Sequence, residues 1–341
     1  MRRTFYTFNY LYAEPGSKTF LTGIREVKNS KKEFYISGVY TPPNSNQTNG
    51  LIYKGYINST LMDRVADNGQ WSMLNYPSKE EETVTSTSLY GPNNGKKKGD
   101  IQVVGSYKTK ETGNKDLGCL YIGKFDGTGK WYKLLPSFDE EIVGVIAHST
   151  MGDLVVGNYD TKSIVGKAFI YDIKEKKYYD ISTLQTNINA KSITAYGIYY
   201  NGCDKYTICG GYSNLKNEEL TYSYIVDWNN KTNKFSNFRT YSYNNDISFI
   251  THFHGISAYG KNGYTLTGDY VDFNKQKHGF IVYIKNKKDR KINGLSIGKW
   301  ELIEYQNQKI TSANSIYYET VIGIYISQNN QVNGFISNIN D

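Results

Sequence analysis

The sequence lacks several features that would assign it quickly to a class of protein. It contains no run of 18 apolar residues, which excludes a membrane-spanning helix. Its first ten residues are basic but hold no continuous apolar segment and no small-residue cleavage site, so we expect no secretory signal and favour a cytoplasmic or virion-associated location. The three cysteines, Cys119, Cys203 and Cys209, are odd in number and follow no metal spacing, which indicates free thiols.

Proline and the helix-favouring residues Ala and Leu are also scarce. Only 6 of the 341 residues are Pro, and the mean hydropathy of −0.58 is low. However, 33 Tyr, 14 Phe and 4 Trp supply ample material for a core, which argues against disorder. The 32 Gly, together with many Asn, indicate numerous tight turns. The abundance of Tyr, Ile, Thr and Val is typical of an all-β protein.

A Gly-X-Tyr triplet at the end of an apolar run occurs six times. The triplets begin at Gly38, Gly105, Gly157, Gly210, Gly268 and Gly323. A second signature, in which apolar residues flank a Gly, precedes each triplet. It lies at Leu21–Ile24, Leu89–Gly91, Ile142–Val145, Ala195–Ile198 and Phe253–Ile256, with Ser replacing Gly at Ala313–Ile316. Two further apolar segments follow most triplets. In the second of these segments, Trp71, Trp131 and Trp300 occupy the same position of their units. Each unit therefore reads as four short strands.

Six units of about 50 to 60 residues with four strands each predict a six-bladed β-propeller of antiparallel blades. The sixth unit ends after its third strand, whereas a spare strand precedes the first unit. We therefore predict that this N-terminal strand pairs in the last blade, which closes the ring and leaves no exposed edge between the termini. The predicted blades of this single domain, 1–341, are 11–76, 84–136, 140–183, 192–240, 248–304, and 310–341 with 2–9.

The fifth unit resembles a known family of repeats. Its segments Thr251–Ile256, Gly268–Tyr270 and His278–Phe280 are similar to the HAF-type extracellular repeat of bacteria, in which Gly-Ile, Gly-X-Tyr and His-Gly-Phe strands recur. The other five units match less closely, and His-Gly-Phe is complete only once. The resemblance implies a propeller-like repeat domain, often on exported proteins, with no settled activity. The richness in Asn, Lys, Ile and Tyr also resembles that of giant amoebal virus proteins.

Candidate binding residues lie on the first strands of the units. His252 and His254 alternate on one strand, so both face the same side, and such a pair is able to ligate a metal. Glu141, which we align with His252, or His148 would then be a third ligand from across the channel. The alternative is that these histidines bond to backbone within the blades, and we assign no metal and no cofactor. Tyr196, in the matching segment of unit four, is a further predicted binding residue.

No catalytic motif stands out. Two Asp- and Gly-containing turns before Trp resemble sialidase boxes, but their spacing departs from the box, and six Arg residues are few for the clustered arginines that a sialidase needs. A glycosidase requires only two carboxylates, and Asp160, Asp269, Glu140 and Glu141 are available without any pair being singled out. There is no nucleophile elbow, phosphate loop or dinucleotide fingerprint.

Charge is unevenly distributed over the predicted ring. The net charge is +8, and basic runs at 25–32, 96–98, 174–177 and 285–291 all fall in turns that join first to second or third to fourth strands. Such lysines are often only solubilising, but a polarised end also fits an acidic protein, a polyanion or a phospholipid surface. The predicted binding residues of this basic face are Lys96, Lys97, Lys98, Lys287 and Lys288. Sequence-specific DNA binding is disfavoured because no recognition helix exists.

We interpret the chain as a non-catalytic binding or structural propeller that engages another protein or a polyanion through its basic loop face. The alternative is a carbohydrate-binding lectin or a glycan-active hydrolase with its site at the central channel, because Tyr rings stack on sugars. Self-association of the chain is left open.

Overall fold

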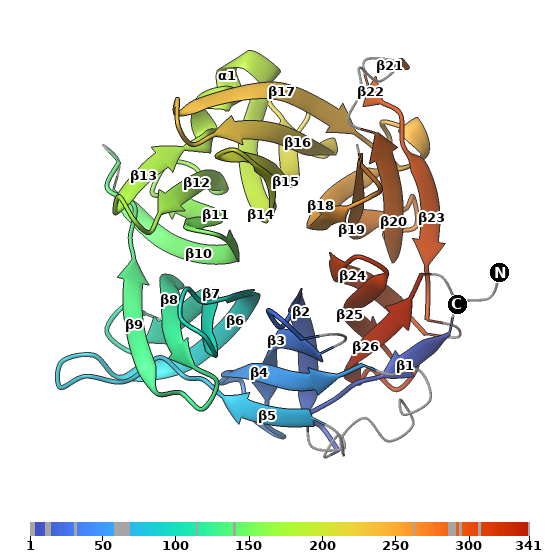
Figure 1. The fold of residues 1–341 in the computed structure, drawn as a ribbon. Helices are drawn as coiled ribbons and strands as arrows, with labels where there is room; N and C mark the ends of the chain where they lie inside the picture. The colour runs from blue at the N-terminus through green and yellow to red at the C-terminus, as the bar shows by residue number, and fades with distance from the viewer. Residues whose placement is uncertain are drawn as a thin grey trace.

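The computed structural model describes residues 4–10, 15–30, 33–57, 69–113, 115–138, 141–261, 263–285, 291–292, 295–305 and 308–339. These residues form six four-stranded antiparallel sheets around a central axis (Figure 1), which confirms the predicted six-bladed β-propeller. The helical segments are short: α1 is Gln185–Ile188, and two 3₁₀ turns are Ile181–Leu184 and Tyr243–Asn245. None of the helices in this part of the chain is long and apolar enough to cross a membrane.

In every blade the first strand lies innermost and the fourth lies outermost (Figure 1). Blade 1 contains β2 (Lys18–Glu26), β3 (Glu33–Thr41), β4 (Asn49–Tyr56) and β5 (Gly69–Met73). Blade 2 contains β6 (Val84–Asn94), β7 (Asp100–Thr109), β8 (Leu117–Lys124) and β9 (Gly129–Leu134). Blade 3 contains β10 (Ile142–Met151), β11 (Leu154–Thr161), β12 (Lys167–Asp172) and β13 (Lys177–Asp180).

Blade 4 contains β14 (Ala190–Gly202), β15 (Lys205–Asn214), β16 (Thr221–Asn229) and β17 (Lys234–Tyr241). Blade 5 contains β18 (Ile250–Ala258), β19 (Gly263–Val271), β20 (Lys277–Lys285) and β23 (Lys299–Ile303). Blade 6 contains β24 (Ile310–Tyr317), β25 (Thr320–Ile326), β26 (Val332–Asn338) and β1 (Phe5–Thr7). A separate two-stranded hairpin is formed by β21 (Lys291–Ile292) and β22 (Leu295–Ser296).

The N-terminal strand closes the ring, as predicted. Strand β1 pairs with β26 in the register Phe5↔Ser337 to Thr7↔Phe335. The next residue, Phe8, donates its backbone N–H to Gly334 O at 2.9 Å. Its ring is 4% exposed and contacts two aromatic rings of blade 1, so the closing segment ties the last blade to the first as well as completing a sheet.

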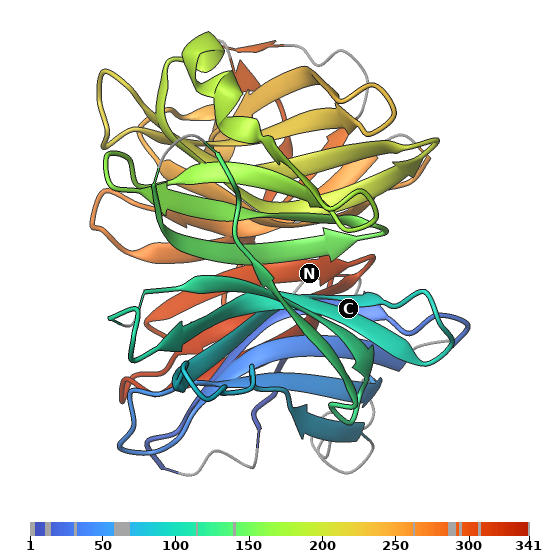
Figure 2. The same ribbon diagram turned by 90° about the vertical axis from the view of Figure 1, so that its left-hand side faces the viewer.

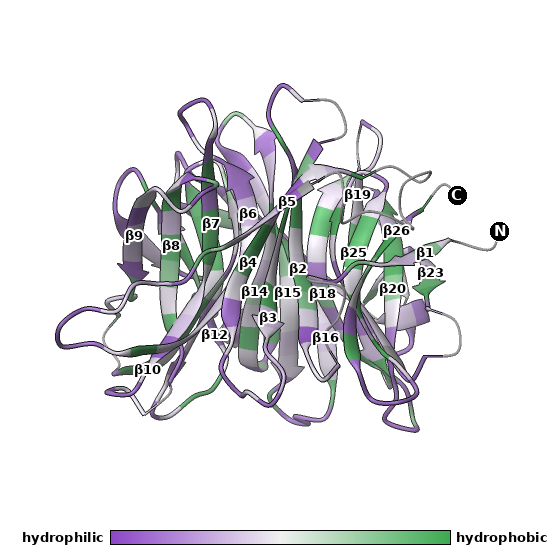
Figure 3. Cartoon of the chain, turned by 90° about the horizontal axis from the view of Figure 1, so that it is seen from below, coloured by the Kyte–Doolittle hydropathy of each residue, from purple (hydrophilic) through white to green (hydrophobic). Residues whose placement is uncertain are grey.

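The hydrophobic core lies between the blades. Apolar residues occupy the strands, while polar residues predominate in the turns (Figure 3). One core cluster combines Leu21, Ile36 and Tyr53 of blade 1 with Ile322 and Ile336 of blade 6. Seen from the side, the turns lie at two opposite ends of the ring (Figure 2). We call the end that carries the first-to-second and third-to-fourth strand turns the basic end, and the other the opposite end.

A β-bulge interrupts the innermost strand of every blade. The bulged residues are Thr22, Tyr90, His148, Tyr196, His254 and Asn314, and in blade 2 Gly91 is also skipped. The residue before each bulge pairs with the first Gly of a Gly-X-Tyr triplet, as in Leu89↔Gly105. The bulges give the six blades a common register, so equivalent positions of different blades become identifiable.

The bulge explains why each triplet begins with Gly. A Cβ atom at the triplet glycines would lie 1.9–2.5 Å from a carbonyl oxygen of the neighbouring innermost strand. The six carbonyls belong to Phe20, Ser88, Ile146, Thr194, His252 and Ser312. Since this contact is with backbone, a side chain is accommodated only if the bulge itself shifts.

The predicted signature of the third unit is out of register. We read it at Ile142–Val145, but the structure pairs Ala147 with the triplet Gly157 and bulges at His148. The equivalent segment is therefore 147–149, in which Ser149 takes the place of Gly. Because the small residue after the bulge is Ser here, the nearby Gly144 misled the sequence alignment.

Candidate functional site

The bulged residues of the six blades form a ring of side chains around the central channel. All six are partly exposed, and each follows a fully buried residue of the blade. Four of them are aromatic or imidazole rings in sequence around the axis: the Tyr90 and His148 centroids are 5.1 Å apart, those of His148 and Tyr196 4.6 Å, and those of Tyr196 and His254 5.1 Å. This arc lines the channel with hydrogen-bonding rings from blades 2 to 5.

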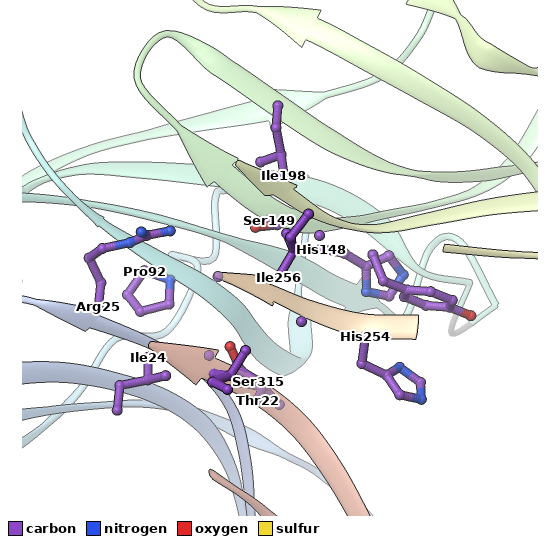
Figure 4. A pocket seen from close by; sticks show the side chains of 16 residues that line it. Thr22, Ile24, Arg25, Pro92, His148, Ser149, Ile198, His254, Ile256 and Ser315 are labelled. Atoms are coloured by element: carbon purple, nitrogen blue, oxygen red, sulfur yellow. The ribbon is translucent and has the colours of Figure 1, made fainter. Parts of the chain in front are cut away.

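A constriction divides the channel at the bulges. A Cβ at Gly23 would lie 2.1 Å from Tyr90 O, and one at Gly91 would lie 2.7 Å from Ser149 Cα, so small residues let neighbouring innermost strands meet. The cavity on the axis is about 30 Å³, which holds little more than one water molecule. In Figure 4 His148 and His254 lie on one side of this cavity and Arg25 on the other. A ligand larger than a few atoms must therefore bind at one end of the channel and not pass through it.

Asp269 is the hub of the polar groups at the opposite end. Its Oδ2 atom accepts hydrogen bonds from His254 Nε2 at 3.1 Å and Ser312 Oγ at 2.9 Å, and Lys277 Nζ is 3.1 Å away. The Asp269 side chain is 4% exposed; burial by itself would raise its pKa, but His254, Lys277 and His252 outweigh burial and hold the pKa well below the ordinary value. The carboxylate is therefore ionised and rigidly held.

The three donors converge on one oxygen of Asp269 and leave the other available. Within the described residues no hydrogen bond or ion pair engages Oδ1. Because a carboxylate only accepts, His254 carries a proton on Nε2, and its Nδ1 has no described partner. The His254 side chain is 21% exposed. The site thus presents the Asp269 Oδ1 acceptor and the Nδ1 edge of His254 beside the ammonium group of Lys277.

His252 also faces Asp269 but is the more deeply placed imidazole. It is paired with Asp269 across the two strands, and its ring packs where a Cβ of Gly211 in blade 4 would otherwise lie, 2.7 Å from His252 Cδ2. Burial lowers the pKa of His252 to about 4, so the ring is neutral at pH 7. Its centroid is 6.5 Å from that of His254. Among the described residues no group of three His, Cys, Asp or Glu side chains is arranged to hold a metal ion.

His148 and Tyr196 continue the polar array towards blade 3. Asn158 Nδ2 donates to His148 Nε2 at 3.0 Å, and Asn158 Oδ1 accepts the Ala195 N–H at 2.8 Å, which joins blade 3 to blade 4. Burial lowers the pKa of His148 to about 3. Burial also raises the pKa of Tyr196, and Asp269 and Asp160 add to the rise, so the Tyr196 hydroxyl is protonated and faces two carboxylates.

A pocket of about 420 Å³ adjoins this array. It is lined mainly by apolar side chains of blade 3, with Asn158, Asp160 and Thr194 among its polar members. Asp160 accepts the Gly166 N–H on Oδ1 at 2.7 Å. We call the Asp269 hub, His254, His252 and Tyr196 the channel mouth; the pocket next to it has the volume of a small-ligand site.

The structure separates Glu141 from the other predicted site residues. Our alignment of Glu141 with His252 is wrong: the register gives Ile146 as the equivalent of His252. Glu141 precedes β10, its side chain is exposed, and its carboxylate pairs with Lys162 at 2.6 Å. The misplacement follows from the displaced third signature. His252, His254 and Tyr196, in contrast, lie together at the channel mouth.

The predicted basic face lies at the other end of the ring. Lys96, Lys97 and Lys98 are exposed in the β6–β7 turn, and Lys96 Nζ pairs with Asp153 of blade 3 at 2.7 Å. Lys287 and Lys288 lie outside the described residues. The structure therefore places His252, His254 and Tyr196 at one end of the ring and Lys96, Lys97 and Lys98 at the other.

Sequence reasoning did not single out several functional groups of the channel. Asn158 and Asp269 are the middle residues of their Gly-X-Tyr triplets. The feature of the sequence that could have identified them is a polar residue at this position, directly after an apolar run. Lys277 opens β20, and nothing in its local sequence distinguishes it. Arg25 was counted in a basic turn, but it lies on strand β2 and lines the channel.

Comparison with known proteins supports the fold and nothing finer. No family model and no curated protein sequence matches the chain, so kinship with HAF-type repeats stays a prediction. Among solved structures, a luciferin-regenerating enzyme matches 99% of this chain and 95% of its own with a TM-score of 0.52 at 10% identity. The β-propeller domain of the trilobed protease from Pyrococcus furiosus matches 93% of this chain and 95% of its own at 11% identity, with a TM-score of 0.45. The first of these shares the propeller fold with this chain, which is the class of protein that the structure defines.

Proposed function

We propose that this propeller is a non-catalytic binding protein that recognises a hydroxyl-rich ligand of glycan type at the channel mouth. The observation that carries the proposal is the buried, ionised Asp269, whose three protein contacts all fall on Oδ2. An ionised carboxylate with one oxygen turned away from its partners is a strong acceptor for a ligand hydroxyl. Placing it in a site that is already rigid lowers the ordering cost of binding.

The surroundings of Asp269 fit the same class of ligand. His254 Nδ1 is without a described partner and available to a ligand hydroxyl, Lys277 donates, and the half-buried ring of Tyr196 offers an apolar face with a polar edge. The adjoining pocket of about 420 Å³ is mainly apolar with a few polar groups, which suits a small ring whose hydroxyls lie at its edge. Asp160 lies in this pocket, so the ligand would span blades 3 to 5.

A microarray of mono- and oligosaccharides, followed by calorimetry on the best binder, tests the proposal. We expect Asp269→Asn to weaken binding about 10- to 100-fold, because a hydrogen bond to a charged group is lost. His278→Gln is the matched control: this histidine lies on the same blade but pairs with Asp272 and Glu304, away from Asp269. It is expected to leave the affinity unchanged.

Two results would contradict the proposal. The first is an array without any saturable binder, and the second is unchanged affinity of a folded Asp269→Asn variant. If the protein released a shorter sugar from the bound ligand, its function would be glycoside hydrolysis and not binding alone. Asp160 and Asp269 would then be the carboxylates to substitute next.

A second candidate function rests on the charge of the basic end. Lys97 and Lys98 are exposed, and no ion pair with an acidic side chain is found for either within the described chain. Lysines held outward in a turn without partners are free to attract an acidic protein or a polyanion. We propose this end as a docking surface for such a partner, independent of the channel mouth.

Charge reversal tests this second surface. We expect Lys97→Glu with Lys98→Glu to lower the salt concentration at which the protein elutes from heparin, while the melting temperature stays the same, because exposed turn residues contribute little to stability. Lys79→Glu with Lys110→Glu makes the same change of charge at the opposite end and is expected to have a smaller effect. If both pairs of substitutions lowered the eluting salt concentration equally, only net charge would matter, and the basic end would not be a docking surface.

A further inference from the structure

Arg25 occupies an unusual place for an arginine. It lies on the innermost strand β2, three residues beyond the bulge, and lines the axial cavity on the side of the basic end (Figure 4). Its guanidinium carbon is 5.3 Å from the centroid of the Tyr317 ring of blade 6. Tyr199 of blade 4, on the far side of the ring, also interacts with its charge. Arg25 lines the axial cavity together with residues of the five other blades, which places its side chain beside the central axis.

The described part of the chain offers this arginine no carboxylate partner. Within the described residues Arg25 forms no ion pair, and its Nε atom is buried without a hydrogen-bond partner. Glu26, the next residue, accepts the Tyr317 hydroxyl at 3.4 Å instead. Burial lowers the pKa of Arg25, and the groups that oppose this effect are all tyrosines. An arginine stays charged in proteins, so this cation has no counter-charge among the residues that the structure describes.

Arg25 is partly exposed, but its Nε–H is buried without a described partner, and its five N–H donors in a planar fork match an oxyanion. The cavity beside Arg25 is only about 30 Å³, so a ligand would meet the guanidinium from the basic end and not from the channel mouth. The exposed lysines at that end, such as Lys97 and Lys98, would raise the local concentration of anions at the entrance.

We propose that Arg25 is the floor of an oxyanion site on the axis of the basic end, which takes a phosphate or carboxylate group. The ring of Tyr317, whose centroid is 5.3 Å from the guanidinium carbon, forms one wall of the site. The site does not rest on either function proposed above, because it is defined by a small anion and lies on the other side of the constriction from Asp269.

The test is thermal unfolding and calorimetry of the full chain with inorganic phosphate, with acetate, and with chloride at equal ionic strength. We expect a saturable rise in melting temperature with phosphate that exceeds the effect of chloride. Arg25→Met is expected to abolish the rise, and Arg25→Lys to keep a weaker one, since Lys supplies the charge without the fork. Comparison of phosphate with acetate identifies which oxyanion is preferred. Lys130→Met, which removes one exposed charge from the same end, serves as control.

Arg25→Met also gives a readout that a structural arginine would not. In chloride of low concentration we expect this variant to be at least as stable as the parent protein, because the buried Nε–H without a described partner is removed. Equal phosphate effects on the parent and on Arg25→Met, or no saturable effect on the parent, would overturn the proposal. Should Arg25→Met not fold, Arg25→Lys and an anomalous difference map of crystals soaked in selenate decide the same question: density beside residue 25 supports the site and its absence refutes it.

Discussion

A chain lacking residues 1–9 is expected to melt about 10 °C below the full chain and in a single transition. The deletion removes β1, and with it the pairing of Phe5 to Thr7 with β26 and the bond from Phe8 N–H to Gly334 O. It also removes the Phe8 ring, whose centroid is 5.0 Å from that of Tyr53 in blade 1. Because the lost strand joins the two ends of the ring, the loss acts on every blade and not only on the last.

Rescue in trans distinguishes this effect from a general truncation defect. A peptide of residues 1–10 is expected to raise the melting temperature of the shortened chain, with saturation, because the edge of β26 is open to it. A peptide with Phe8→Ala should restore less. Two separate unfolding transitions, or a change of no more than about 2 °C, would show that the closing strand does not couple the blades.

Replacement of a triplet glycine is the second change with a large expected effect. Gly105→Ala should destabilise the protein by about 3 kcal/mol or more, because the new Cβ would lie 2.1 Å from Ser88 O and 3.2 Å from Leu89 Cα. Both are backbone atoms held by the bulge and by pairing within blade 2. No side-chain rearrangement relieves the contact, so the strand pairing must shift.

Gly144→Ala is the matched control for this substitution. The nearest atom to a Cβ at Gly144 is Asp160 Oδ2 at 3.6 Å, which is ordinary contact, and its backbone is open to any residue. We expect a change of no more than about 1 kcal/mol in chemical denaturation. Equal losses for Gly105→Ala and Gly144→Ala would mean that the bulge does not dictate the glycine, and the explanation of the triplet given above would fail.

The parts of the site that sequence analysis located are those that depend on one strand. His252 and His254 are two residues apart on β18, and this local spacing, with the bulge at His254, brings both to the side of Asp269. Glu141 was misplaced because the comparison required a register between blades. That register depends on the bulge at His148, where one extra residue interrupts the alternation of inward and outward side chains. The residue after this bulge is Ser149 and not Gly, so the sequence does not reveal where the bulge lies.

Arg25 illustrates a second limit. Adjacent to Glu26 and close to a turn, it reads as one member of a basic run, and nothing local indicates that it faces Tyr199 and Tyr317 from other blades. The same holds for Asp269, whose partners Ser312 and Lys277 come from a neighbouring blade and a neighbouring strand. Contacts across the axis join residues separated by up to hundreds of positions, and no periodicity encodes them.

What the sequence by itself determined is the architecture: six Gly-X-Tyr triplets, one column of Trp and a spare first strand define six blades and their closure, because strand count, glycine positions and apolar runs are properties of each repeat. Only the tertiary structure decided the chemistry of the channel. Which side chains meet there depends on how the bulges set the register between blades. It also depends on the approach of their backbones at Gly23 and Gly91, which separates an ionised Asp269 at one end from an unpaired Arg25 at the other.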